Sequence, residues 1–197
     1  MSIFNQNITE IKNTAWVRGD GTGFKADDNK SYVYRYTDPT SSSAIHSGII
    51  FDPVTIPQGS TINSAYIELY GNYTSEWDAY FHLFGNDVDD AADFTVELDI
   101  YTRARTTANV AYTGENISIG YWGSAFDITT IIQEIIDRVG WASGQAICLL
   151  LIGDTGSSKQ YRYGDVGNPP RIHIDYTATV LAVPGHGALR TKRIINL

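Results

Sequence analysis

Apolar residues between Asp127 and Gly140 recur at the spacing of a helix. The stripe consists of Ile128, Ile131, Ile132, Ile135, Ile136 and Val139. The Asp127 carboxylate can accept from free N–H groups in the first turn, and Gly140 can take the left-handed conformation that often ends a helix. Isoleucine is a mediocre helix former, so this element depends on tertiary packing. We predict one amphipathic helix at about 127–139, and we expect Ile132→Asp to prevent folding.

An unbroken apolar run, AICLLLI, follows at Ala146–Ile152. A run of strand length without alternation indicates a strand that is covered on both faces. Cys148 is the only cysteine of the chain, so no intramolecular disulfide can form. We interpret it as a small buried hydrophobic residue. The helix is therefore expected to close the side or end of a sandwich, directly before a central strand.

Strict alternation marks a second kind of strand. In Asn63–Tyr70 the apolar residues Ala65, Ile67 and Leu69 face one way, while two tyrosines and a glutamate face the other. In Arg171–Tyr176 two isoleucines share a face in the same manner. Further strands are predicted at Thr14–Val17, Ser31–Tyr36, Ile45–Phe51, Ala79–Phe84, Thr106–Tyr112 and Gln160–Tyr163. Phe94–Ala104 stays ambiguous. The pattern predicts an all-β fold, a jelly-roll β-sandwich with one helix, over residues 1–177.

Composition narrows the class of protein. The 197 residues suit one domain or one domain with an extension, and 43% hydrophobic residues can build a sizeable core. The net charge of −8 argues against a nucleic-acid partner, which needs a basic face. No stretch reaches the roughly 20 apolar residues of a membrane span. The first residues lack a basic stretch followed by an apolar run, so we expect no secretory signal.

The last residues, 178–197, differ from the rest and form a candidate arm. From Pro184 onward they contain three basic residues and no acid, whereas residues 1–183 carry a net −11. The apolar and basic candidates for docking are Val180, Leu181, Leu189, Arg190, Lys192, Arg193, Ile194 and Ile195. A disordered tail usually lacks so many apolar residues. We favour docking on a neighbouring subunit; the alternatives are that the arm folds back on its own domain or is disordered.

Catalytic motifs are missing from the sequence. The four histidines do not have zinc-ligand spacing, and neither a GxSxG elbow nor a phosphate loop occurs. We therefore expect no enzyme and no cofactor. Hard oxygen ligands close together can hold Ca²⁺, and Asp87, Asp89, Asp90 and Asp93 are the candidates, although the spacing is not that of an EF-hand loop.

Aromatic side chains supply a second kind of candidate site. Rings present an apolar face with polar edges, which suits stacking against sugars. The candidate glycan-binding residues are Tyr32, Tyr34, Tyr36, Trp77 and Trp122. The alternative is that these rings pack on sheet faces and serve only the fold.

Four stretches resemble a bacterial and phage β-sandwich module, similar to the DNRLRE-type and carbohydrate-binding jelly-roll domains of surface and secreted proteins. They are Gly48–Gly71, Arg103–Val110, Phe126–Gly153 and Pro169–Tyr176. The resemblance implies the fold and brings no catalytic motif. With the arm and the missing signal, it leads us to expect a phage virion structural protein, in a capsid decoration, tail or fibre. We expect it on the virion surface, docked to other virion proteins or to its own copies, with host-surface glycans as further partners. The alternative is a secreted or extracellular carbohydrate-binding module.

Overall fold

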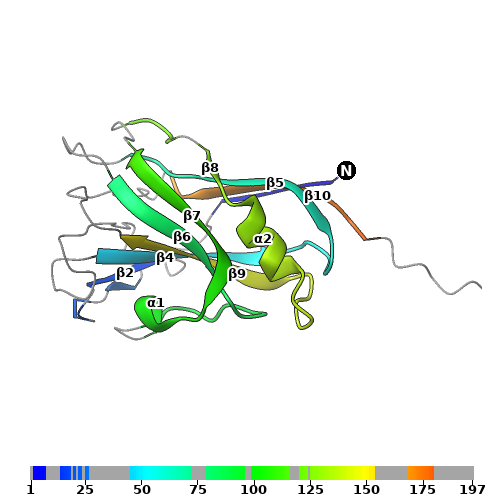
Figure 1. Ribbon diagram of the computed structural model, residues 1–197, viewed down its shortest axis with the longest axis horizontal. Helices are drawn as coiled ribbons and strands as arrows, with labels where there is room; N and C mark the ends of the chain where they lie inside the picture. Colours follow the sequence, from blue (N-terminus) through cyan, green and yellow to red (C-terminus); the bar gives the residue numbers. More distant parts are fainter. Residues whose placement is uncertain are drawn as a thin grey trace, which may run out of the picture.

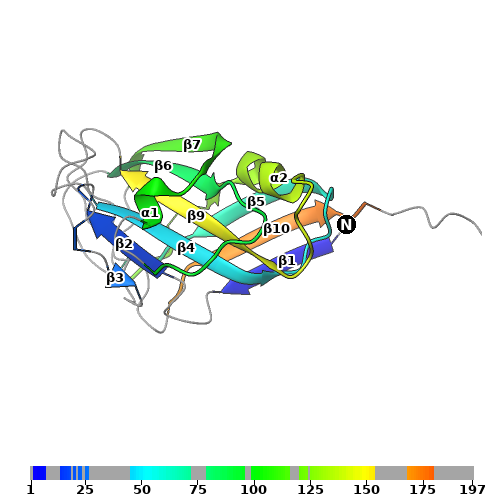
Figure 2. The ribbon, with the colours of Figure 1, turned by 90° about the horizontal axis from the view of Figure 1, so that it is seen from below.

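Two antiparallel sheets face each other in the computed structural model (Figures 1 and 2). The structure describes residues 2–7, 14–18, 20, 22–23, 25–26, 45–71, 79–95, 99–115, 120–123, 125–153 and 168–179. Sheet A has, in spatial order, β1 (Ser2–Asn7), β10 (Arg171–Thr177), β5 (Thr61–Glu68) and β8 (Phe126–Asp127). Sheet B has, also in spatial order, β3 (Lys25–Ala26), β2 (Thr14–Arg18), β4 (Ile45–Val54), β9 (Gln145–Gly153), β6 (Ala79–Asn86) and β7 (Arg105–Glu115).

The strand order is that of a jelly roll. From β4 onward the chain passes to the opposite sheet at every step except the β6–β7 hairpin. The sets β1-β10-β5-β8 and β4-β9-β6-β7 therefore interleave as two Greek keys, and β2 and β3 extend sheet B. This confirms the predicted β-sandwich, which follows here from the pairing of the strands themselves.

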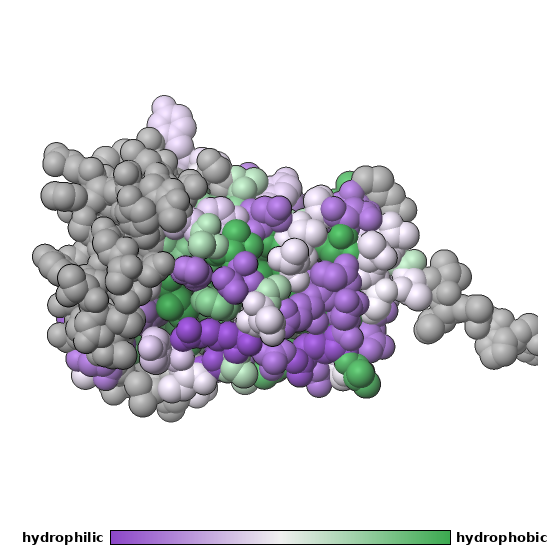
Figure 3. All heavy atoms as spheres, viewed as in Figure 1, coloured by the Kyte–Doolittle hydropathy of each residue, from purple (hydrophilic) through white to green (hydrophobic). Residues whose placement is uncertain are grey.

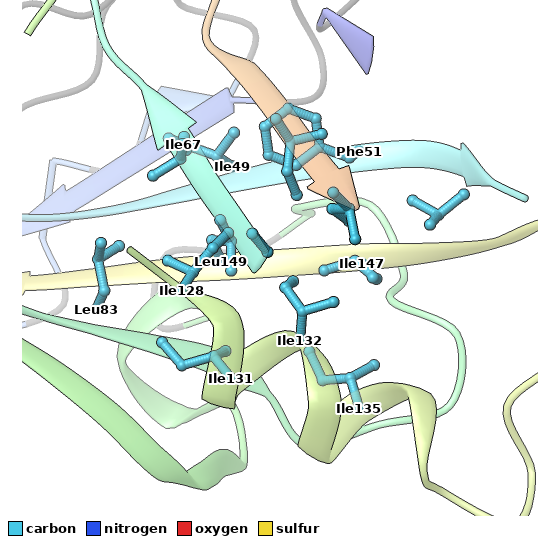
Figure 4. Packing of buried hydrophobic residues seen from close by; sticks show 14 of the residues in the cluster. Ile49, Phe51, Ile67, Leu83, Ile128, Ile131, Ile132, Ile135, Ile147 and Leu149 are labelled. Atoms are coloured by element: carbon cyan, nitrogen blue, oxygen red, sulfur yellow. The ribbon is translucent and has the colours of Figure 1, made fainter. Parts of the chain in front are cut away.

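The main core lies between the two sheets. The alternation of apolar and polar residues along β5 places its apolar side chains in this core. Ala65, Ile67 and Leu69 are buried as predicted, and the inward residues of β10 are buried as well. Figure 4 shows Ile67 close to Ile49 of β4, and the isoleucines of α2 beneath Leu149 of β9. Trp141 is buried as well, and its Nε1 donates to the carbonyl of Ile56 at 2.9 Å.

Strand β9 is covered on both faces, as its unbroken apolar run predicted. Ile147, Leu149 and Leu151 belong to the main core, while Cys148 and Leu150 belong to a second apolar cluster on the outer face of sheet B. The chain between β6 and β7, including the short helix α1 (Asp99–Thr102), covers this cluster. α1 lies in the stretch that the sequence left ambiguous.

Helix α2 (Thr129–Ile136) is shorter than the predicted 127–139 and closes one side of the sandwich, against β5, β6 and β7 (Figure 1). The N-cap residue is Ile128, which makes no side-chain capping bond, but the Asp127 carboxylate just before it accepts from the N–H of Thr129 at 2.8 Å. Two details of the prediction were wrong. Val139 is 95% exposed, since the helix has ended before its turn would face the core. Gly140 is also not among the glycines with positive φ, and the chain instead passes it close to Asp89.

The remaining differences concern the ends of the predicted elements. β1 was not recognised as a strand, and β4 continues three residues beyond the expected Phe51. The strands predicted at Ser31–Tyr36 and Gln160–Tyr163 and the arm from Val180 lie outside the described residues. On the side shown in Figure 3, hydrophilic side chains predominate around α2, with smaller hydrophobic areas between them.

Candidate ligand-binding face

The outer face of sheet A gathers polar and aromatic side chains from three strands. Alternation sends Tyr66 and Glu68 of β5 and Arg171 and His173 of β10 away from the core. The register places Arg171 opposite Glu68, His173 opposite Tyr66, and Asn5 of β1 opposite His173. Side chains that are up to 168 residues apart in the sequence therefore form one continuous row.

His173 is held in place on three sides. Its ring stacks on Tyr66 with a centroid distance of 4.6 Å and an interplanar angle of 21°. Its Nε2 lies 2.9 Å from a Glu68 carboxylate oxygen, and its Nδ1 lies 2.6 Å from the side-chain oxygen of Asn5. A carboxylate only accepts, so Nε2–H donates to Glu68. Buttressing of this kind fixes the ring and the carboxylate before any ligand arrives.

A second aromatic group lies at the end of the same face. Trp122 forms an isolated bridge with Tyr70, and their rings meet edge-on at 5.3 Å between centroids. The Arg171 guanidinium carbon lies 3.6 Å from the centroid of the Trp122 ring. Backbone bonds from Gly71 N–H to the Tyr121 carbonyl, at 2.9 Å, and from Gly123 N–H to the carbonyl of residue 69, at 2.7 Å, hold this segment beside β5. Arg171 therefore takes one face of the Trp122 ring.

Arg171 is the least satisfied polar group of this face. Its Nε is the one buried side-chain nitrogen or oxygen without a hydrogen-bond partner in the described part of the chain. The guanidinium is thus positioned by stacking on an indole, which is a favourable cation–π arrangement, rather than by protein acceptors. Tyr121, which precedes Trp122 in the sequence, is 70% exposed. The face therefore offers a guanidinium and a carboxylate that are both held in place.

One of the predicted glycan-binding residues can be placed on this face. Trp122 belongs to it, whereas Tyr32, Tyr34, Tyr36 and Trp77 lie outside the described residues and stay predictions. Sequence reasoning missed Arg171, His173 and Glu68 as site residues. The available signal was the alternation in Arg171–Tyr176, which already placed an arginine and a histidine opposite two buried isoleucines.

The acidic loop after β6 is engaged in contacts within the protein. The Arg138 guanidinium, just beyond α2, contacts both Asp87 and Asp89, and its Nε lies 2.7 Å from the Asp89 carboxylate. The hydrogen bond that Arg138 donates to Asp89 raises the pKa of Arg138, with a further contribution from Asp87. Asp90 accepts from the N–H of Ala146 at 2.8 Å.

The remaining predicted calcium ligand is Asp93, whose backbone carbonyl accepts from Arg103 at 3.1 Å. Within the described residues no three acidic, histidine or cysteine side chains lie together in a group that could hold a metal. Through these contacts Asp87 and Asp89 attach the loop to Arg138, just beyond α2, and Asp90 attaches it to β9. The predicted calcium site stays a prediction.

Comparison with known proteins gives no family and only a weak similarity to solved structures. No family model matches the chain, and no curated protein matches it. Among solved structures the chain is similar to one described as CBM35 from Paenibacillus barcinonensis, at 12% identity. The alignment covers 91% of this chain and all of the other, with a TM-score of 0.32. A score this low carries no argument, so the fold rests on the strand pairing and the ligand-binding face has to be judged on its own chemistry. Among the described helices, neither is long and apolar enough to cross a membrane.

Proposed function

We propose that this chain is a non-catalytic, glycan-binding β-sandwich and that the ligand lies on the outer face of sheet A. The observation that carries the proposal is the half-buried Arg171 guanidinium, stacked 3.6 Å from the centroid of Trp122, whose Nε has no acceptor among the described residues. Beside it, the Glu68 carboxylate is held by His173. A sugar needs donors, acceptors and a ring surface in one place, and these residues supply all three.

The charges of the face favour a neutral sugar over an acidic one. Arg171 is accompanied by three carboxylates on the same sheet face or at its edge, from Glu68, Asp127 and Asp175. Carboxylates accept hydrogen bonds from hydroxyl groups, but they repel a ligand that carries its own carboxylate or sulfate. The aromatic rings would pack against the C–H face of the sugar, while the guanidinium donates to ring or hydroxyl oxygens.

A panel of neutral and acidic oligosaccharides tests this proposal, with binding measured by calorimetry. We expect Tyr66→Ala and Arg171→Ala to weaken binding of the best ligand by at least roughly tenfold, about the effect of one buried contact. His82→Ala is the matched control, because His82 also stacks on an aromatic ring, Phe84 at 5.9 Å, but on the outer face of sheet B. Unchanged binding by both site variants, or equal loss in the control, would rule out this face.

A role as a phage virion component remains the competing prediction. It depends on the arm at 178–197, most of which lies outside the described residues, and no described contact favours it over glycan binding. The two roles are compatible where an outward-facing sandwich is attached through its tail. Placement on a particle surface or outside the cell is part of either proposal, because glycans are exposed there.

A further inference from the structure

The two sheets have four edge strands, and edge strands expose unpaired backbone groups that can pair with another chain. Sheet A is bounded by β1 and β8, and sheet B by β3 and β7. Proteins commonly protect such edges by keeping them short, by charging them or by covering them. The four edges of this molecule can therefore be compared for protection.

Two of the four edges are very short, and a third is covered over part of its length. β8 and β3 are two residues long, which is too short to serve as a template. β7 has eleven residues, but α2 packs along it (Figure 1). The Glu134 carboxylate of α2 accepts from the backbone N–H groups of Thr107 at 2.8 Å and Ala108 at 2.7 Å. Those two donors of β7 are therefore satisfied by the protein's own helix.

Within the described part of the chain, β1 has none of these protections. Its six residues, SIFNQN, contain no charged residue and no proline. It pairs with β10 along its whole length, from Ser2 opposite Tyr176 to Asn7 opposite Arg171, without a bulge. Within the described residues no strand or helix lies on its other side. Ile3 on this strand is 69% exposed, which is unusual for a large aliphatic side chain in this molecule.

We propose that β1 is a dimerisation edge, which pairs antiparallel with β1 of a second copy of this chain. A second copy offers a strand of the same length with the same free groups, so a two-fold axis satisfies both edges at once. The neutral strand also suits two molecules that each carry a net −8, because no like charges meet at the contact. This inference does not depend on glycan binding.

The geometry of the pairing follows from the faces of β1. A two-fold axis perpendicular to the sheet keeps outward residues outward, so Phe4 of both copies stays on the core side, where it packs against the main cluster. Ile3 then lies against the outward residues of the other β1 and loses its exposure. The product is one eight-stranded sheet across two copies, with the two outer faces of sheet A side by side.

Sedimentation of the full chain at up to roughly 100 µM tests the proposal, since a contact of one short strand pair should be weak. Ile3→Lys adds a charge to the edge and is expected to weaken the dimer by at least about tenfold. Val139→Lys is the matched control, because it adds the same charge at another exposed aliphatic residue, away from β1. It should leave the dimer unchanged.

Hydrogen exchange on the unmodified chain gives a readout that needs no variant. Amides of β1 that do not bond to β10 should gain protection as the concentration rises, while other exposed amides should not. A protein that stays monomeric over the whole range would overturn the proposal. So would a dimer that Ile3→Lys leaves intact, or one that forms without added protection in β1.

Discussion

At Gly48 the packing of sheet B depends on the absence of a side chain. A Cβ at this position would lie 2.3 Å from the ring of Phe94, which covers the strand from outside. The ring is itself covered by Arg103, whose guanidinium carbon lies 4.4 Å from its centroid. A shift of the ring away from Gly48 would therefore also disturb its contact with Arg103.

We expect Gly48→Ala to lower the free energy of unfolding by about 1–3 kcal/mol, the usual cost of overpacking. Urea denaturation measures the change. Ser64→Ala is the control, because Ser64 is an exposed residue of β5 and should tolerate the same small side chain. If Gly48→Ala were as stable as the unmodified protein, the close approach of Phe94 would not matter for the fold.

Residue-scale features were predictable where they depend on local pattern. The hydrogen bond from the first turn of α2 to the Asp127 carboxylate and the burial of Cys148 follow from their neighbours in the sequence, and both are observed. The contact of Arg171 with Trp122 has a different origin. It depends on how β5, β10 and the bridge at Tyr70 come into register, and no local pattern specifies that alignment. The candidate binding face was therefore only partly foreseeable.

At the scale of elements, α2 shows both the strength and the limit of periodicity. Ile131, Ile132, Ile135 and Ile136 are all buried, so the apolar stripe correctly identified the face that meets the core (Figure 4). Periodicity could not say where the helix ends, because Val139 continues the spacing after the hydrogen-bonding pattern has stopped at Ile136. In β1 the apolar pattern is too weak to predict a strand, because Phe4 packs against the core while its neighbour Ile3 is exposed.

The two ends of the predicted stripe give a matched pair of substitutions. Ile132 is fully buried, so Ile132→Asp places a carboxylate without a partner in the core, at a cost above about 4 kcal/mol. That is comparable to the whole stability of many domains, about 5–15 kcal/mol, and we expect no cooperative melting. Val139→Asp should change stability by less than about 0.5 kcal/mol. Thermal melting by circular dichroism distinguishes the two, and a folded, cooperatively melting Ile132→Asp protein would contradict the expectation.

At the scale of the whole molecule, the number of strands and their alternation were enough to predict a sandwich, but not the order of strands within each sheet. The sheet order joins the two ends of the domain, since Ser2 lies opposite Tyr176. Pairings between residues so far apart in the sequence follow from burial of the whole core. The entropy cost of closing the long loops between them rises only slowly with loop length. The jelly-roll topology is therefore a property of the assembled sheets rather than of any one segment.

A contact of Thr179 with the sandwich decides where the chain should be truncated to test the role of the arm. The predicted boundary was at residue 177, but the hydroxyl of Thr179 donates to the carbonyl of Gly59, so a truncation should keep residues 1–179. If the arm docks on neighbours, light scattering should show larger assemblies for the full chain than for the truncated chain at matched concentration. A dimer through β1 should survive the truncation, because all residues of that edge remain. Identical assembly of both chains would exclude docking of the arm on copies of this chain, while loss of every dimer would assign self-association to the arm instead of β1.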